Sequence, residues 1–161
     1  MNKRTFLVSL LVTVVAIVFA SQAPSFTFET IQGETIRSDA LLEKGPIFLN
    51  FWSTSCVPCK NKLPHVSSFA EKYPDMSFLA ISTDSPRHRD AVVRLVRSNR
   101  YNFTTSIDAN RSLQRMFNVS TIPRSVIIDQ EGQIVYDSTG YIAGDEEKIE
   151  AEIKAVLGVT Q

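Results

Sequence analysis

Two cysteines three residues apart, placed soon after a short apolar segment, limit most strongly what this chain can fold into. Residues 47–51 have the length and apolar composition of a buried β-strand, and a polar turn separates them from Cys56-Val57-Pro58-Cys59. Pro58 suits the first turn of a helix, where a backbone N–H has no intrahelical partner to lose. The pattern therefore predicts a strand, a short turn and a helix that begins beside Cys56.

The position of Cys56 at a helix N-terminus favours its thiolate form. Unpaired backbone N–H groups and the positive end of the helix dipole stabilise an anion there, and the thiolate is the reactive form of cysteine. Cys59 follows about one helical turn later, close enough to form a disulfide with Cys56. We therefore predict that Cys56 is the nucleophile that attacks a partner disulfide, and that the more buried Cys59 resolves the mixed disulfide.

Three other interpretations of the cysteine pair fit less well. A structural disulfide that closes so short a loop removes little entropy from the unfolded chain. A structural zinc site usually takes four Cys or His ligands, and His65 and His88 stand at unsuitable spacings from the two cysteines. A peroxiredoxin motif requires proline and threonine at the positions of Leu49 and Ser53. We therefore favour a redox-active disulfide that works without a metal or a nucleotide cofactor.

Four sequence features together resemble the thioredoxin superfamily. They are Trp52 four residues before Cys56, the Cys-Val-Pro-Cys-Lys core, Pro64 eight residues after Cys56, and Thr121-Ile122-Pro123. Over residues 24–158 the chain is most similar to the exported TlpA-like thiol–disulfide oxidoreductases, which include reductants of cytochrome c maturation. The resemblance implies an α/β thioredoxin-like fold. Its mixed central sheet would be flanked by helices, with an N-terminal β-hairpin and an extra segment between the cysteine helix and Pro123.

The resemblance also implies a surface for a substrate peptide. The bond between Ile122 and Pro123 is expected to be cis and to face the cysteine pair, which leaves the backbone of Ile122 free to pair with a substrate strand. The substrate-binding residues implied in this way are Trp52, Val57, Pro58, Ile122 and Pro123.

Three positions depart from the resembling families and are candidate modulators of the site. Asn50 stands where thioredoxins carry a buried aspartate, Lys62 where many relatives carry glutamate, and Arg124 where many carry threonine. A lysine that points inward would stabilise a thiolate, whereas one on the outer face of the helix would be solvated; both orientations remain open for Lys62. Arg124 is expected to make the rim of the site cationic.

Residues 1–23 have the pattern of a targeting segment. Lys3 and Arg4 precede an apolar run over residues 6–20, and small residues ending at Ala20 or Ala23 could precede cleavage. About 15 apolar residues are enough for a signal peptide and short for a membrane-spanning helix, so a cleaved leader and a retained anchor both remain open. The sequence predicts export to the periplasm, with residues 24–161 forming one domain that is soluble or tethered by this segment.

The charge balance argues against a nucleic-acid partner. The formal net charge is zero, and removal of residues 1–20 leaves 15 basic and 17 acidic residues, a charge of −2. The resemblance instead implies disulfide-bonded or dithiol protein substrates, and a membrane protein that supplies electrons. With that supply the protein would act as a reductant in an oxidising compartment. A dithiol oxidase or isomerase, or a non-catalytic peptide-binding module on the same fold, are the alternatives.

The rest of the chain predicts alternating strands and helices. A hairpin is expected over residues 25–37, followed by a short helix that Ser38 caps. A second helix should begin after Ser85, which would cap it. The other expected elements are strands over 76–83 and 102–107, a helix over 108–117, a hairpin over 124–137 and a last helix over 144–157.

Overall fold

A six-stranded mixed sheet organises residues 21–159, the part of the chain that the computed structural model describes. The strands follow the order β1-β8-β7-β4-β5-β6 across the sheet. β4 pairs in parallel with β5, and β5 with β6, whereas β7 is antiparallel to both β4 and β8. Their bounds are Ser21–Gln22 for β1, Ile47–Trp52 for β4, Ser77–Ser82 for β5, Thr104–Ile107 for β6, Arg124–Ile128 for β7 and Gln133–Thr139 for β8.

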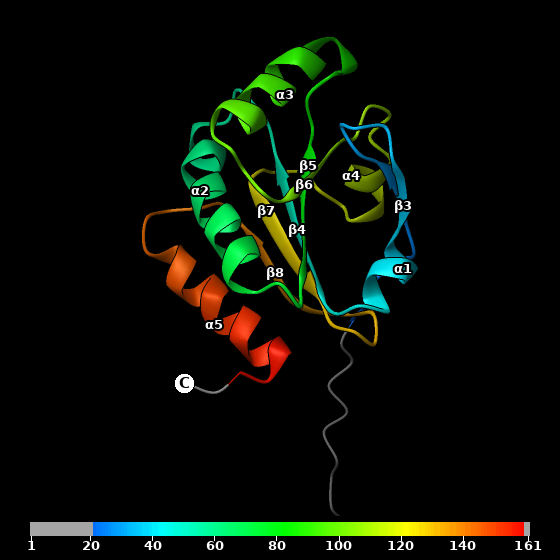
Figure 1. Ribbon diagram of the computed structural model, residues 1–161, viewed down its shortest axis with the longest axis vertical. Helices are drawn as coiled ribbons and strands as arrows, with labels where there is room; N and C mark the ends of the chain where they lie inside the picture. The colour runs from blue at the N-terminus through cyan, green and yellow to red at the C-terminus, as the bar shows by residue number, and fades with distance from the viewer. Residues whose placement is uncertain (1–20, 160–161) are drawn as a thin grey trace, which may run out of the picture.

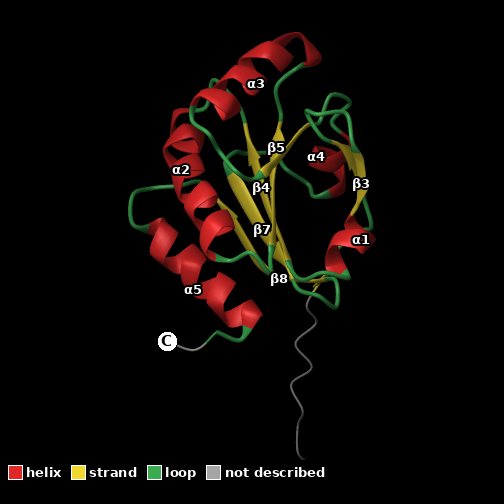
Figure 2. Cartoon of the chain, in the orientation of Figure 1, coloured by secondary structure: helices red, strands yellow, loops and turns green. Residues whose placement is uncertain are grey.

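Helices and a hairpin cover the two faces of this sheet (Figure 1). On one face lie α2 (Val57–Lys72), α3 (Arg89–Ser98) and α5 (Asp145–Leu157). On the other lie α1 (Ser38–Leu42), α4 (Ser112–Met116) and the hairpin of β2 (Thr27–Glu29) and β3 (Thr35–Arg37), as Figure 2 also shows. The mixed α/β thioredoxin-like architecture predicted from the sequence is thus confirmed.

Alternation along β4 divides the core into two clusters. All six residues of β4 are fully buried, because the strand lies between β5 and β7 in the sheet and between helices above and below it. Phe48 and Trp52 pack in the cluster that includes side chains of α2, α3 and α5. Ile47, Leu49 and Phe51 pack in the opposite cluster, with α4 and β2. Since successive side chains of a strand point to opposite faces, Asn50 lies on the α2 side.

The predicted elements are present with changes at two helix starts. Ser38 does not cap α1: its hydroxyl is buried and accepts a hydrogen bond from the backbone N–H of Phe26 at 3.0 Å. Its side chain therefore ties the hairpin to the helix instead of closing the helix end. After Ser85, residues Pro86–His88 form a 3₁₀ turn, and α3 begins only at Arg89, with no side-chain cap from Ser85. Both capping predictions were wrong.

The N-terminal end of the described chain joins the sheet. Residues 1–20 of the predicted targeting segment lie outside the described residues, but Ser21–Gln22 form β1 and pair with β8. The side chain of Gln22 and the backbone N–H of Ala23 both donate to the carbonyl of Gly132 at 2.9 Å. The folded unit therefore includes three residues that the sequence placed in the leader. None of the helices between residues 21 and 159 is long and apolar enough to cross a membrane.

Candidate active site

The turn between β4 and α2 places Cys56 at the first position of the helix. Cys56 is the N-cap residue of α2, with extended backbone angles, and its carbonyl accepts from the backbone N–H of Lys60 at 3.1 Å. The turn is held by the buried carboxylate of Asp84, which follows β5. Thr54 donates to that carboxylate through its backbone N–H and its hydroxyl, each at 2.8 Å. The parallel strands β4 and β5 thus fix the loop that carries the cysteine.

Cys56 and Cys59 are joined in a disulfide, with an S–S distance of 2.02 Å and a Cα–Cα distance of 5.2 Å. The backbone N–H of Cys59 donates to Cys56 Sγ at 3.2 Å, so an N–H of the helix N-terminus already points at this sulfur. Cys56 is half-buried, whereas Cys59 is fully buried. This asymmetry is what the predicted roles of nucleophile and resolving cysteine require.

The loop before β7 reaches the same end of the sheet as the cysteine turn. β7 runs antiparallel to β4 with Arg124 opposite Phe51, so the residues before Arg124 lie near the segment that follows Phe51. The bond between Ile122 and Pro123 is cis. Pro123 is buried, and its carbonyl accepts from the backbone N–H of Gly140 at 2.7 Å. Ile122 is half-buried, and its backbone N–H and C=O have no hydrogen-bond partner among residues 21–159.

The side chains expected around the cysteines divide into exposed and buried groups. Val57 is 61% exposed and Pro58 is also exposed, so both can meet a partner at the start of α2. Trp52 differs from the prediction: its side chain is fully buried at the end of β4 and offers no surface to a substrate. Its indole packs in the core cluster that contains Cys59, so it supports the site from below.

A polar cluster lies beneath the disulfide. Lys62 is 1% exposed, so it points into the protein and not into solvent. Its ammonium donates to the hydroxyl of Ser125 on β7, and that hydroxyl donates to Asn50 Oδ1 on β4 at 3.4 Å. Asn50 and Ser125 face each other in the register of the two strands. The two positions at which the chain departs most from thioredoxins, Asn50 and Lys62, are thereby linked through a third residue.

Burial controls the charge of this lysine. Desolvation lowers the pKa of Lys62 from its ordinary value of 10.5 to about 8, and the carboxylate of Asp145 offsets part of that shift. Its Nζ lies 5.9 Å from the centre of the Tyr141 ring. Burial, followed by a hydrogen bond to Glu146, raises the pKa of Tyr141 to about 12. At pH 7 the lysine is therefore mostly protonated, although its surroundings favour the neutral form.

Arg124 does not form the free cationic rim that we expected. Its guanidinium binds both carboxylate oxygens of Asp137 on β8 and donates to the carbonyl of Asn118 at 2.8 Å. The side chain is 18% exposed. Because its donors are occupied in this way, Arg124 fixes the loop before Pro123 against β8 instead of offering a charge to a substrate.

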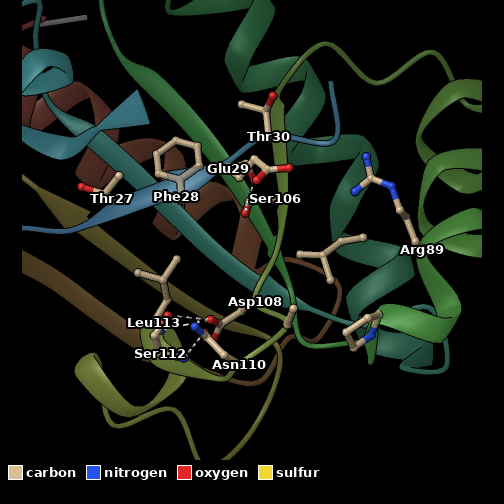
Figure 3. Close-up of a pocket in the computed structure, with 13 residues that line it drawn as sticks. Thr27, Phe28, Glu29, Thr30, Arg89, Ser106, Asp108, Asn110, Ser112 and Leu113 are labelled. Atoms are coloured by element: carbon tan, nitrogen blue, oxygen red, sulfur yellow. Dashed lines mark hydrogen bonds between the residues drawn. The ribbon is translucent and has the colours of Figure 1, made fainter. Parts of the chain in front are cut away.

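A separate pocket of about 350 Å³ lies beside the β2–β3 hairpin, β6 and the start of α3 (Figure 3). Neither cysteine lines it. Its charged groups are already paired: Arg89 donates to the carbonyl of Ile31 at 2.8 Å. The carboxylate of Asp108 accepts from the first turn of α4, through Ser112, Leu113 and Gln114. These bonds hold α3 and α4 in place, so the pocket is explained by packing.

A family model described as the AhpC/TSA family matches residues 19–137, which is most of the chain. The chain belongs to the AhpC/TSA family. This family member still lacks the peroxiredoxin motif, because Leu49 and Ser53 occupy its proline and threonine positions. Its chemistry is therefore sought in the cysteine pair.

Sequence relatives of this AhpC/TSA protein are thiol–disulfide oxidoreductases. ResA of Bacillus subtilis (strain 168) is 31% identical over 120 residues, which cover 74% of this chain and 66% of that protein. ResA of Bacillus cereus (strain ZK) is 31% identical over 114 residues, which cover 71% and 65%. The chain thus spans slightly less than two thirds of the length of each. The predicted resemblance to thioredoxin-like proteins of the TlpA group is confirmed.

Solved structures share the fold of this AhpC/TSA protein. A secreted Mycobacterium tuberculosis disulfide oxidoreductase homologous to E. coli DsbE superimposes with a TM-score of 0.72 at 24% identity, covering 81% of this chain and 95% of that one. StoA from Bacillus subtilis superimposes with a TM-score of 0.67 at 24% identity, covering 80% and 96%. At these identities the likeness establishes the fold and carries no statement about activity.

Sequence reasoning missed three residues of the site. Ser125 was detectable, because a polar side chain interrupts an otherwise apolar strand over residues 124–128. Asp84 was assigned only to a helix start, since nothing in its spacing shows that it reaches back to Thr54. Tyr141 lies in the loop between β8 and α5, and its contact with Lys62 depends on how α5 packs on α2.

Proposed function

We propose that this AhpC/TSA protein is an exported thiol–disulfide oxidoreductase that exchanges disulfides with protein substrates through Cys56 and Cys59. The observation that carries the proposal is the asymmetry of the pair: Cys56 is the half-buried N-cap of α2, and Cys59 is fully buried behind it. A partner can reach Cys56 without displacing the fold, whereas Cys59 can be reached only from Cys56. The sequence relatives named for this activity support the same assignment.

The proposed exchange proceeds in two displacements. In the reduced protein, the Cys56 thiolate attacks one sulfur of a substrate disulfide and forms a mixed disulfide, and the other substrate sulfur leaves as a thiolate. The Cys59 thiolate then attacks Cys56 Sγ, so that the internal disulfide forms and the substrate leaves with its second thiolate. Two electrons pass to the substrate. A dithiol protein returns the pair to its reduced state by the reverse steps.

The backbone beside the pair supports a peptide substrate. Ile122 has no backbone hydrogen-bond partner among the described residues, and it precedes the buried Pro123 at the end of the sheet where Cys56 lies. An extended segment that pairs with Ile122 would bring its disulfide alongside Cys56, with Val57 and Pro58 as apolar contacts. We therefore place the substrate strand between the start of α2 and residue 122.

Export and the reductant role complete the proposal. The pattern of residues 1–20 supports export, as does the description of the mycobacterial structural relative as secreted. Because β1 pairs with β8 through Ser21–Gln22, we propose that any cleavage follows Ala20 and leaves β1 in the mature protein. In an oxidising compartment a reductant needs a supply of electrons, which we assign to a membrane-bound dithiol protein.

The test is disulfide reduction by the described domain, with each cysteine replaced in turn. Wild-type protein supplied with a dithiol should reduce a disulfide-bonded protein such as insulin. Cys56→Ser should reduce turnover to the background rate, and Cys59→Ser should accumulate mixed disulfides through Cys56. Mixed disulfides that form equally well through Cys59 in the Cys56→Ser protein would reverse the two roles. A wild-type protein that never exchanges with a dithiol would leave the fold as a peptide-binding module.

A further inference from the structure

Hydrogen-bond donors outnumber acceptors in the buried layer between β4 and α2. Asn50 and Trp52 lie on the face of β4 that packs against α2, and among the described residues Asn50 Nδ2 and Trp52 Nε1 have no acceptor. The ammonium of Lys62 has three protons and a single hydrogen-bond partner among residues 21–159, the Ser125 hydroxyl. Buried donors without acceptors are rare in native proteins, so a cluster of them calls for an explanation.

No carboxylate forms an ion pair with Lys62 within residues 21–159. Asp145, at the start of α5, acts on it electrostatically, but its oxygens bond to the backbone N–H of Ile142 and to Lys148. The Tyr141 ring faces Lys62, and His65 of α2 lies beside that ring at 6.0 Å. β4 and β7 contribute only neutral groups. The disulfide form therefore holds a buried cation without a contacting counter-ion.

Cys59 occupies the same face of α2 as Lys62. The two residues are three apart on the helix, a spacing that brings side chains onto neighbouring positions about 5–6 Å apart at Cβ. Both are fully buried, on the side of α2 that packs over the sheet. When the disulfide opens, the Cys59 sulfur is the nearest group on this helix face that can acquire a negative charge.

Resting on the exchange reaction proposed above, we infer that Lys62 is a positioning residue whose ammonium is the counter-charge of the Cys59 thiolate, and that it favours the reduced state of the pair. During reduction, the thiolate of a dithiol protein bonds to Cys56 Sγ, the Cys56–Cys59 bond breaks, and its electron pair remains on Cys59 as a thiolate. The second thiolate of the donor then releases Cys56 and completes the donor's disulfide. Cys59 takes up no proton while Lys62 keeps its own.

The same arrangement removes the need for a base in the opposite direction. Thioredoxins resemble this chain but carry an aspartate where Asn50 stands, and the resemblance assigns that aspartate to proton transfer at the resolving cysteine. A Cys59 that is already a thiolate beside Lys62 attacks Cys56 Sγ directly. A neutral Asn50 is compatible with this chemistry, whereas a carboxylate at that position would compete with the thiolate for the ammonium.

The ionisation of Cys59 can be measured alone in a Cys56→Ser background, in which it is the sole thiol. Thiolate absorbance is followed against pH with Lys62 intact and with Lys62→Met. An opposite charge within about 4–6 Å changes a thiolate-to-thiol ratio by tenfold or more. We expect Lys62→Met to lower the ratio for Cys59 at least tenfold at a fixed pH. Lys60→Met, which removes an exposed charge next to Cys59, should change it less than about threefold.

The redox equilibrium of the intact pair gives the second readout. At pH 8 and a fixed glutathione ratio, Lys62→Met should lower the reduced-to-oxidised ratio of the pair severalfold, and Lys62→Gln serves if the methionine variant does not fold. An unchanged Cys59 titration in both variants would overturn the inference and leave the exchange reaction standing. A wild-type pair that does not equilibrate with glutathione at all would instead refute the proposed function.

Discussion

Two buried charged side chains support the cysteine turn, and they are satisfied in opposite ways. The carboxylate of Asp84 accepts three hydrogen bonds of 2.8 Å, two from Thr54 and one from Ser82. The ammonium of Lys62 has one hydroxyl partner, Ser125, and no carboxylate partner within the described part of the chain. Asp84 is therefore a completed anchor, whereas Lys62 is a charge whose environment improves when an anion appears. The difference separates a group that fixes the loop from one that responds to chemistry.

Removal of the anchor should have the largest effect on stability. Asp84→Ala leaves the Thr54 N–H and two hydroxyls without their acceptor, and hydrogen bonds to a charged group contribute about 1.5–3 kcal/mol each without being additive. We expect the free energy of unfolding to fall by about 3–4 kcal/mol in urea denaturation. Asp75→Ala, at an exposed carboxylate without a side-chain hydrogen bond among the described residues, should change it by less than about 0.5 kcal/mol. A loss below about 1 kcal/mol for Asp84→Ala would remove its role as anchor.

Removal of the unsatisfied charge should act in the opposite direction. In the disulfide form at pH 7, Lys62→Met should raise the free energy of unfolding by about 2–3 kcal/mol, because an apolar side chain carries no desolvation cost. The sign of the pH dependence follows from the lowered pKa. The unfolded state binds more protons than the folded state between pH 8 and 10.5, so the wild type gains stability as pH rises through that window.

The two pH profiles test this cause directly. Below pH 8 the folded wild type carries the full cost of its buried charge, and the advantage of Lys62→Met should be constant there. The advantage should shrink as pH rises towards 10.5, because the wild-type lysine is then neutral in both states. An advantage that is independent of pH up to 10.5 would mean that packing, and not charge, separates the two proteins.

Loss of the single partner of Lys62 should have a smaller effect. Ser125→Ala removes the acceptor of the ammonium and the donor to Asn50, and it should lower the free energy of unfolding by about 1–2 kcal/mol. In a Lys62→Met background the same substitution should cost roughly half as much, since no buried cation then needs the hydroxyl. Strict additivity of the two substitutions in this double-mutant cycle would show that Ser125 and Lys62 are not coupled.

The sequence predicted the parts of this site that local rules control. The apolar run before the turn, Pro58 near a helix start and the paired cysteines are local signals, so the strand, the helix and the disulfide follow from them. The inward orientation of Lys62 could not be predicted, because a lysine three residues after Cys59 has no local reason to be buried. The anchoring of Thr54 by Asp84 depends on β4 and β5 pairing in parallel, and the pairing of Arg124 with Asp137 on the register of β7 and β8.

Conversion of the responsive charge into a satisfied one is the subtlest test of the comparison. Asn50→Asp places a carboxylate beside Ser125, on the face of β4 that α2 covers, and so gives Lys62 a nearby anion. At pH 7 the free energy of unfolding should change by less than about 1 kcal/mol, because the desolvation of a second charge offsets the attraction between the two. The pH profile should change clearly: a counter-ion returns the lysine pKa towards 10.5, folded and unfolded states then bind the same number of protons, and the gain in stability above pH 8 disappears. Asn61→Asp, which adds a carboxylate at the exposed neighbour of Lys62, should keep the wild-type profile in urea denaturation at pH 7, 8.5 and 10. A profile for Asn50→Asp that still rises above pH 8 would mean that the two buried charges do not sense each other, and that the lysine obtains its counter-charge only from Cys59.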